Sequence, residues 1–219
     1  MPVSDNRRGM DKLRRTVAAM HGMAVQVGVF GDDSARKDEG NGISNVRLAA
    51  VHEFGATIDH PGGTPYIWGS DGALFLNKSK LGSSARSKFN IPVTKAHKIK
   101  IPERSFIRGA FDQYRALIAA ASDGFNLAVL DGKMTPRSAM ERLGLIIQGL
   151  IQKRMSRGIG PALARSTVKR KQMMSAVGRR MRKKSMAGPA NVKPLIDTGQ
   201  LRNSVTYRVT KRVYTSGGR

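Results

Sequence analysis

The chain has 219 residues, a formal net charge of +24 and no cysteine. This length can hold one large domain or two small ones, and a hydrophobic content of 40% is enough for a core, which excludes global disorder. Without cysteine there is no disulfide framework, no thiolate metal site and no cysteine nucleophile.

The positive charge is unevenly distributed along the chain. Residues 142–196 carry fourteen Lys and Arg and no acidic residue, and residues 142–219 carry 19 basic residues against one acid, Asp197. The last third therefore holds +18 of the net charge, and the first 141 residues hold +6. This asymmetry predicts a negatively charged partner, and it carries no information about the fold.

The first predicted elements alternate between helix and strand. Apolar residues at helical spacing predict an amphipathic helix over residues 10–21, and alternating valines predict a strand over residues 25–29. Ser44 can cap a helix over residues 45–54, and Gly55 can end that helix in the left-handed conformation.

A β-hairpin is predicted next. Two short apolar runs, residues 66–68 and 73–76, flank a Gly-Ser-Asp-Gly turn. Residues 91–93 and 98–101 are expected to extend the same sheet. Pro92 and Pro102 are placed at its edges or ends, because proline has no N–H to donate.

Two longer helices and one more strand complete the prediction. The first helix covers residues 104–130, and the second covers residues 136–155, with Thr135 as its cap and Pro136 in its first position. Alternation over residues 201–209 predicts the clearest strand of the chain.

The expected fold class is α+β: a small antiparallel sheet with a hairpin, packed against two longer helices, plus a basic mobile arm. We expect a single domain over residues 1–219, in which residues 157–193 form the basic, flexible insertion or arm.

The sequence nominates no active site. The histidines lie in different elements without the paired spacing of a metal site; they are His21, His52, His60 and His97. His52 and Glu53 are adjacent, so they lie on different faces of a helix and form no acid–base pair. A buried or interface helix end is expected at residues 51–55 instead. No phosphate-binding loop or nucleophile elbow is present, so we expect a protein without catalysis, cofactor or metal.

No membrane or secretory segment is expected either. The most apolar stretches, residues 116–130 and 143–151, are too short or interrupted to cross a bilayer. Residues 1–15 are charged and lack the apolar region of a signal peptide.

The basic tract suits phosphate contact better than sequence readout. No zinc finger, zipper or RNA-recognition signature is present, and no aromatic residue lies in residues 142–196, so base stacking is not its mode. Nonspecific contact with phosphate, docking on an acidic protein and a merely solvated basic arm all stay open. The densest cations of the tract are Arg179, Arg180, Arg182, Lys183 and Lys184.

A short polar segment precedes the last predicted strand. The side chains of Asp197 and Thr198 can accept backbone hydrogen bonds in a tight turn, and Gly199 permits positive φ. The simplest interpretation is an ordinary loop-to-strand turn.

Three segments, in this order, resemble the tail-completion or neck proteins of tailed bacteriophages, also called virion morphogenesis proteins. They are VHEFG at residues 51–55, IPERSF at residues 101–106 and PLIDTGQLRNS at residues 194–204. The last is the most specific. Residues 60–66 and 163–167 also fit, so the resemblance covers most of residues 24–209. In two departures, Ser105 stands where the family often has a second proline, and residues 172–192 look like a variable insertion.

The resemblance implies an α+β subunit without catalysis, assembling as a ring where the head connector meets the tail, with six-fold symmetry by family analogy. Its implied partners are further copies, phage head-connector and tail proteins, and genomic DNA passing through nonspecifically. Its implied location is the neck or tail of a virion assembled in the host cytoplasm. The motif residues are interpreted as structural, with Phe54 and Phe106 in the core and residues 197–199 forming the turn into the strand at Leu201. The full set is Phe54, Gly55, Pro102, Phe106, Asp197, Thr198, Gly199 and Leu201.

Within this hypothesis, the five cations of residues 179–184 face the DNA lumen or an acidic neighbouring ring. The rival hypothesis is a free, nonspecific nucleic-acid-binding protein whose basic segment folds on DNA or RNA. A nuclease or other processing enzyme would need clustered carboxylates or histidines, and the sequence scatters them.

Overall fold

The computed structural model describes residues 7–31, 43–69, 72–76, 90–165, 167–168, 194–195 and 199–211. It confirms the α+β class. The elements of these residues are α1 (Arg7–His21), β1 (Met23–Gly28), α2 (Asn45–Phe54), β2 (Ala56–His60), β3 (Tyr66–Gly69), β4 (Gly72–Phe75), β5 (His97–Ile101), α4 (Arg108–Gln113), α5 (Arg115–Leu130), α6 (Pro136–Arg157), α8 (Gln200–Asn203) and β6 (Thr206–Lys211).

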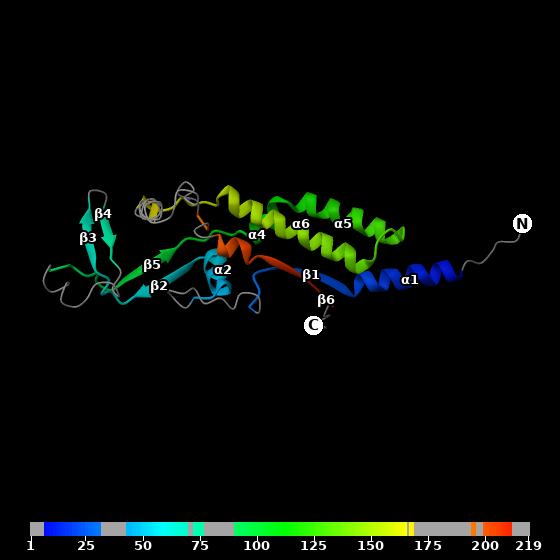
Figure 1. Cartoon of the computed structure of the whole chain (residues 1–219), viewed down its shortest axis with the longest axis horizontal. Helices are drawn as coiled ribbons and strands as arrows, with labels where there is room; N and C mark the ends of the chain where they lie inside the picture. Colours follow the sequence, from blue (N-terminus) through cyan, green and yellow to red (C-terminus); the bar gives the residue numbers. More distant parts are fainter. Residues whose placement is uncertain are drawn as a thin grey trace, which may run out of the picture.

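The molecule is elongated, with a helical body between two projecting parts (Figure 1). Helices α5 and α6 run side by side in the body, and α1 extends from one end of it. The other end continues into β2 and β5, and then into the β3–β4 hairpin. We call residues 56–69, 72–76 and 90–101 the ribbon. Among the described residues, strands pair only two by two and antiparallel: β1 with β6, β2 with β5 and β3 with β4.

The body is built on the β1–β6 pair. Val25 lies opposite Val209 and Val27 opposite Tyr207, and helix α6 packs on these strands. The helix comes close because Gly144 faces the strand: a Cβ at this position would clash with the ring of Tyr207. The fully or nearly buried core around this contact consists of Ala49, Phe106, Ala110, Ile147, Ile151, Met155, Leu201 and Val205.

Capping residues in the sequence correctly predicted where α2 and α6 begin and where α2 ends. The Ser44 side chain accepts from the backbone N–H of Arg47, and that of Thr135 accepts from Ser138, as expected of N-caps. Gly55 ends α2 with a φ of 72°. The hairpin and α1 are also confirmed.

Three expected elements are wrong in part. Residues 104–107 are not helical, and the helix predicted over residues 104–130 begins at Arg108 and is interrupted at Tyr114. Strand β5 pairs with β2, which was not predicted, rather than extending the hairpin; a single bridge between Pro65 and Val93 connects the two ladders. The strand predicted from Leu201 starts at Thr206 instead.

The error at Leu201 has a clear cause. Leu201 and Val205 are both buried, at 5% and 0% exposure. Positions four apart share a face in a strand and also in a helical turn, so their spacing fits either structure. Gly199, at a φ of 80°, lies at the N-terminus of α8, so the turn at this glycine leads into a helical turn and not into a strand.

Candidate functional site

The first two motifs meet at a buried carboxylate. Glu53, near the end of α2, is 4% exposed. It accepts hydrogen bonds from the backbone N–H groups of Phe106 at 2.8 Å, Ile107 at 2.9 Å and Arg108 at 2.9 Å. The first N–H groups of a helix have no partner inside it, and the helix dipole favours a negative charge there. Glu53 thus caps α4 from more than fifty residues away in the chain.

Side chains complete this junction. The Ser105 hydroxyl donates to Glu53 Oε1 at 2.7 Å, and Arg108 Nε donates to the same oxygen at 3.2 Å. Arg108 also donates to the backbone carbonyl of Glu53 at 2.9 Å and to Glu103 at 2.7 Å. The backbone N–H of Arg104 donates to the carbonyl of His52 at 2.7 Å. VHEFG and IPERSF therefore form one hydrogen-bonded unit.

Gly55 belongs to the same unit. A Cβ at this glycine would lie 3.0 Å from the backbone nitrogen of Glu103 and 3.1 Å from the carbonyl oxygen of Ile101. The positive φ and this close backbone approach both require glycine. Pro102 follows directly after β5, at the strand end where it was expected.

The junction holds Glu53 in its charged form. Burial alone would raise the pKa of Glu53, but the donors from Ile107, Arg108, Ser105 and Phe106 outweigh burial and hold the pKa below its ordinary value. Because its oxygens are already engaged by these donors, the carboxylate acts as a structural anchor. The geometry offers no proton-transfer role for it.

A buried arginine lies close to His52. Arg104 is 6% exposed, and its Nε and Nη2 donate to the carbonyl of Pro161 at 3.2 and 3.0 Å. Burial lowers the pKa of His52, and the charge of Arg104 lowers it further. His52 Nδ1 is buried without a hydrogen-bond partner in the described part of the chain.

The third motif joins the same core through its apolar residues. Leu201 belongs to the buried cluster that contains Phe106. Gln148 on α6 donates to the carbonyl of Val205 at 2.8 Å, which fixes the chain just before β6. Gly199 has the predicted positive φ, whereas Asp197 and Thr198 lie outside the described residues.

One predicted core residue is wrong. Phe106 is fully buried, but Phe54 is 64% exposed, with the guanidinium of Arg108 4.8 Å from its ring centre. Adjacent residues of a helix point in different directions, so the inward position taken by Glu53 leaves Phe54 outside. Sequence reasoning missed Glu53, Arg104 and Arg108, because no local pattern reveals a cap supplied from a distant segment.

The ribbon presents a different kind of surface. In the β2–β5 ladder, Ile58 lies opposite Ile99, while Asp59 opposes Lys98 and Thr57 opposes Lys100. Successive side chains alternate between faces. One face is apolar except for the His60–His97 pair at its end, and the other face is polar and charged. Ile58 and Ile99 are nevertheless 45% and 38% exposed.

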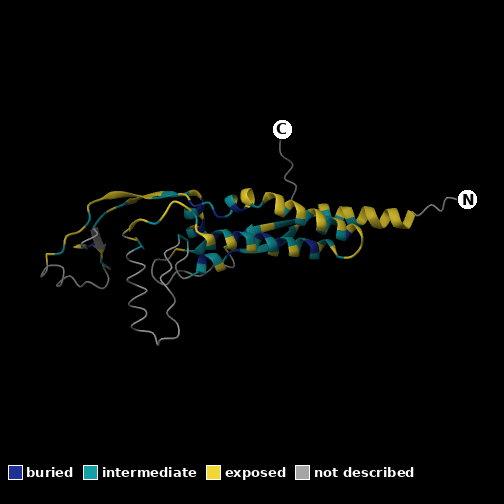
Figure 2. Cartoon of the chain, turned by 90° about the horizontal axis from the view of Figure 1, so that it is seen from above, coloured by how far each residue is buried: buried dark blue, intermediate teal, exposed yellow. Residues whose placement is uncertain are grey.

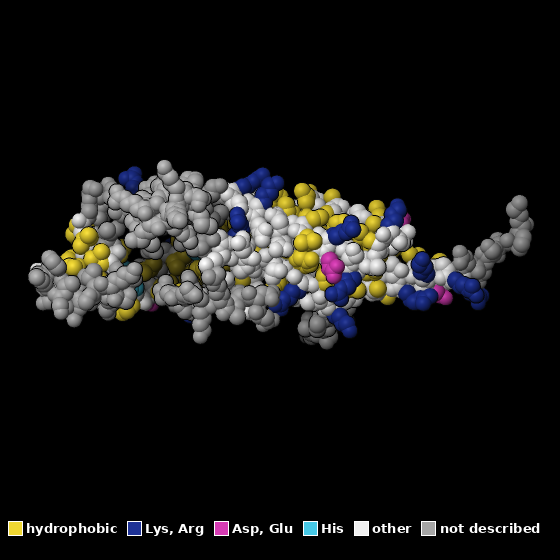
Figure 3. Space-filling model, in the orientation of Figure 1, with side chains coloured by type: hydrophobic (Ala, Val, Ile, Leu, Met, Phe, Trp, Pro, Cys, Tyr) yellow, Lys and Arg dark blue, Asp and Glu magenta, His cyan; other side chains and the backbone are white. Residues whose placement is uncertain are grey.

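The hairpin at the end of the ribbon carries aromatic residues. Tyr66 contacts Trp68 edge-on, with ring centres 5.7 Å apart, and lies 6.4 Å from Phe75. Trp68, the one tryptophan of the chain, is 73% exposed, and Phe75 is 55% exposed. Figure 2 shows exposed residues following the ribbon and α1, with the buried residues between them, and Figure 3 shows hydrophobic surface at the hairpin end.

The remaining candidate sites can be stated briefly. The five predicted contact cations, Arg179, Arg180, Arg182, Lys183 and Lys184, and most of residues 157–193 lie outside the described residues. Among the described residues, no three His, Asp or Glu side chains gather as metal ligands. No helix in these ranges is long and apolar enough to cross a membrane.

Comparison with protein-family models, curated proteins and solved structures finds no match for this chain. The resemblance to phage neck proteins therefore rests on the three sequence motifs.

Proposed function

We propose that this chain is a non-enzymatic structural subunit of a tailed-phage virion. It completes the tail or joins it to the head, as a ring around the DNA channel in the neck. The three motifs suggest this class, and the contacts between VHEFG and IPERSF are consistent with a shared structural role.

The observation that carries the proposal is the exposed apolar face of the ribbon. An isolated two-stranded ribbon is marginally stable in water, and large apolar patches on soluble chains mark surfaces that partners cover. On this ribbon, the side chains of Ile58, Ile99 and Trp68 are large, apolar and exposed. A subunit that projects an apolar ribbon from its body is suited to assembly with further copies and with connector or tail proteins.

Mass measurement tests this assembly role. The purified chain is measured by native mass spectrometry, alone and mixed with phage head-connector proteins, and we expect a ring or a defined complex. Ile58→Ser with Ile99→Ser should yield monomers, whereas the control Thr57→Ser with Lys100→Ser, on the opposite face, should assemble like the wild type. Monomers under every condition, or equal assembly by both pairs, would contradict the proposal.

The basic segment that contains residues 179–184 has a separate role in the proposed function. We assign the cations of residues 179–184 to the DNA lumen or to an acidic neighbouring ring. Replacing all five with Ser or Gln should impair head-to-tail joining or DNA retention while the subunit stays folded. Virions formed at wild-type yield would refute this assignment.

The second candidate function is a free, nonspecific nucleic-acid-binding protein. The net charge of +24 favours it, since such a charge attracts any polyanion. It differs from the virion role in requiring tight, salt-dependent binding by a monomer that forms no complex with connector or tail proteins.

A further inference from the structure

Helix α1 separates its charged and apolar residues onto two sides. At 100° per residue, the cations of the first nine residues occupy one side of the helix, and the apolar residues occupy the other. The cations are Arg7, Arg8, Lys12, Arg14 and Arg15, and all five are exposed. The apolar residues are Met10, Leu13, Val17 and Met20.

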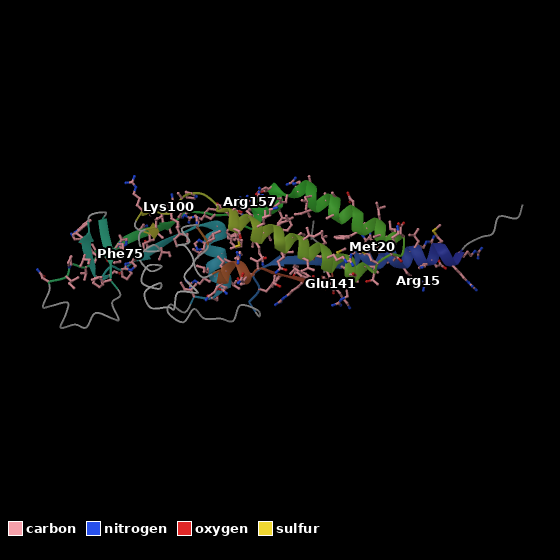
Figure 4. All side chains as sticks on the ribbon, turned by 45° about the horizontal axis from the view of Figure 1, so that its top comes forward. Arg15, Met20, Phe75, Lys100, Glu141 and Arg157 are labelled. Carbon is pink, nitrogen blue, oxygen red and sulfur yellow. The ribbon has the colours of Figure 1, made fainter. Side chains whose placement is uncertain are left out.

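Helix α1 meets the body along the boundary between these two sides. Thr16, Ala19 and Met20 are half-buried, and Lys12, Leu13 and Thr16 line a cleft with Val129 of α5 and Pro136 of α6. Most of the apolar side stays exposed, at 54% for Met10, 44% for Leu13 and 38% for Val17. The other four cations, Arg7, Arg8, Arg14 and Arg15, do not line this cleft and are exposed. Figure 4 places Arg15 on the projecting helix, at the opposite end of the molecule from Phe75, and Figure 3 shows Lys and Arg gathered over that end.

The charge on the basic side of α1 is complementary to a regular row of phosphates. Five cations and one acid, Asp11, lie within nine residues, or about 12 Å of helix at 1.5 Å per residue. Duplex DNA carries one negative charge per about 1.7 Å of its axis, so several phosphates lie within that length. The helix has no aromatic residue for base stacking, so its contacts would be to the backbone.

We propose that the basic side of α1 binds the phosphate backbone of duplex DNA without sequence preference. The inference rests on the proposed function, in which the genome passes through the ring, and it adds a DNA contact separate from residues 179–184. An anionic membrane is the competing partner, because Met10, Leu13 and Val17 are exposed beside the cations, and the experiment below distinguishes the two.

Salt-dependent binding of the full chain to a fluorescent 30-base-pair duplex tests this role. In the test variant, Arg7, Arg8, Lys12, Arg14 and Arg15 become Gln, which keeps a good helix former in each place. The control variant changes five other exposed cations to Gln and removes the same charge: Lys95, Lys100, Arg115, Arg142 and Lys153. Circular dichroism checks that both variants stay folded.

Each phosphate contact contributes about 0.9 to the slope of log K against log salt concentration. The test variant, which removes five cations, should therefore lose about 4.5 from that slope if each contacts a phosphate, and the control variant should lose much less. Equal losses of slope in the two variants would mean that only the overall charge matters, and this would overturn the inference. An unchanged slope in the test variant would overturn it as well. Wild-type binding to phosphatidylserine vesicles but not to DNA, lost in the test variant, would assign α1 to lipid and overturn it too.

This outcome is separable from that of the proposed function. A chain that assembles with connector proteins while its α1 variant keeps the wild-type DNA slope refutes the inference alone. The converse result is that the chain fails to assemble while its DNA-binding slope still depends on the cations of α1. That result refutes the virion role and supports the DNA-binding surface on α1.

Discussion

Glu53 and Ile58 lie five residues apart in the chain, yet their surroundings are the reverse of what their side chains prefer in isolation. The carboxylate of Glu53 is 4% exposed, and the hydrocarbon of Ile58 is 45% exposed. At the motif junction, a buried charge is acceptable because donors from one chain satisfy it. On the ribbon, an exposed apolar face has no such compensation within the described residues. The junction is thus complete in a single chain, whereas the ribbon leaves Ile58, Ile99 and Trp68 exposed to solvent.

The largest expected effect separates the two phenylalanines of the motifs. Phe106→Ala should lower the free energy of unfolding by about 3–5 kcal/mol, because it empties a fully buried site. Phe54→Ala should cost only about 0.5–1 kcal/mol, the worth of an exposed cation–π contact with Arg108. Urea unfolding of both variants measures the difference. Similar losses would mean that Phe54 is buried in solution and that the junction is wrongly described.

The next effect concerns the cap of α4. Glu53→Gln should lower the free energy of unfolding by about 3 kcal/mol, since it removes the charge that buried N–H groups and Arg108 share. The matched control is Glu103→Gln, whose carboxylate meets Arg108 at the surface and should contribute less than about 1 kcal/mol. An equal loss of unfolding free energy in both variants would mean that the buried carboxylate of Glu53 stabilises the fold no more than a surface carboxylate does.

Whether the sequence alone could predict a contact of this structure depends on how far apart in the chain the two contacting residues lie. The caps at Ser44 and Thr135 lie three residues from the N–H groups they bind, so local rules located them. Glu53 and the start of α4 are separated by more than fifty residues, and only folding brings them together. The same holds for the pairing of β2 with β5. Strand β2 has the sequence ATIDH, whose single exposed isoleucine gives too weak an alternation to predict a strand.

A pH effect should appear at the junction and be smaller than the loss in Glu53→Gln. The pKa of His52 in the folded chain lies below its unfolded value of 6.5. The resulting stability is fully present above pH 6.5, and it declines as pH falls because the unfolded chain then binds the proton more readily. Glu53, whose folded pKa is also depressed, adds its loss only at lower pH, near and below its unfolded value of 4.5.

Replacing His52 isolates its part of this decline. Urea unfolding between pH 7 and pH 5 should give a flatter stability profile for His52→Gln than for the wild type. A wild-type decline that survives in His52→Gln would place its origin elsewhere.

The smallest expected effect on stability lies on the ribbon. Trp68→Ser should change the free energy of unfolding by no more than about 0.5 kcal/mol, because the indole is 73% exposed and contributes little within one chain. Its effect on assembly should be large instead, since buried aromatic residues dominate the energy of protein interfaces. Ribbon and junction would then differ in kind: one variant loses partners and keeps its fold, and the other loses its fold.

Trp68 also reports on the ribbon without any mutation, because the chain has no other tryptophan. In the monomer, its fluorescence should be that of an indole in water and should be readily quenched by acrylamide. If partners cover the hairpin, the emission should move to shorter wavelength and the quenching should fall as the protein concentration rises or connector protein is added. The Ile58→Ser and Ile99→Ser pair, which should not assemble, should keep the monomer spectrum under the same conditions. Emission that stays unchanged while the mass of the particle increases would mean that assembly leaves the hairpin exposed, and the interface would have to lie on the body.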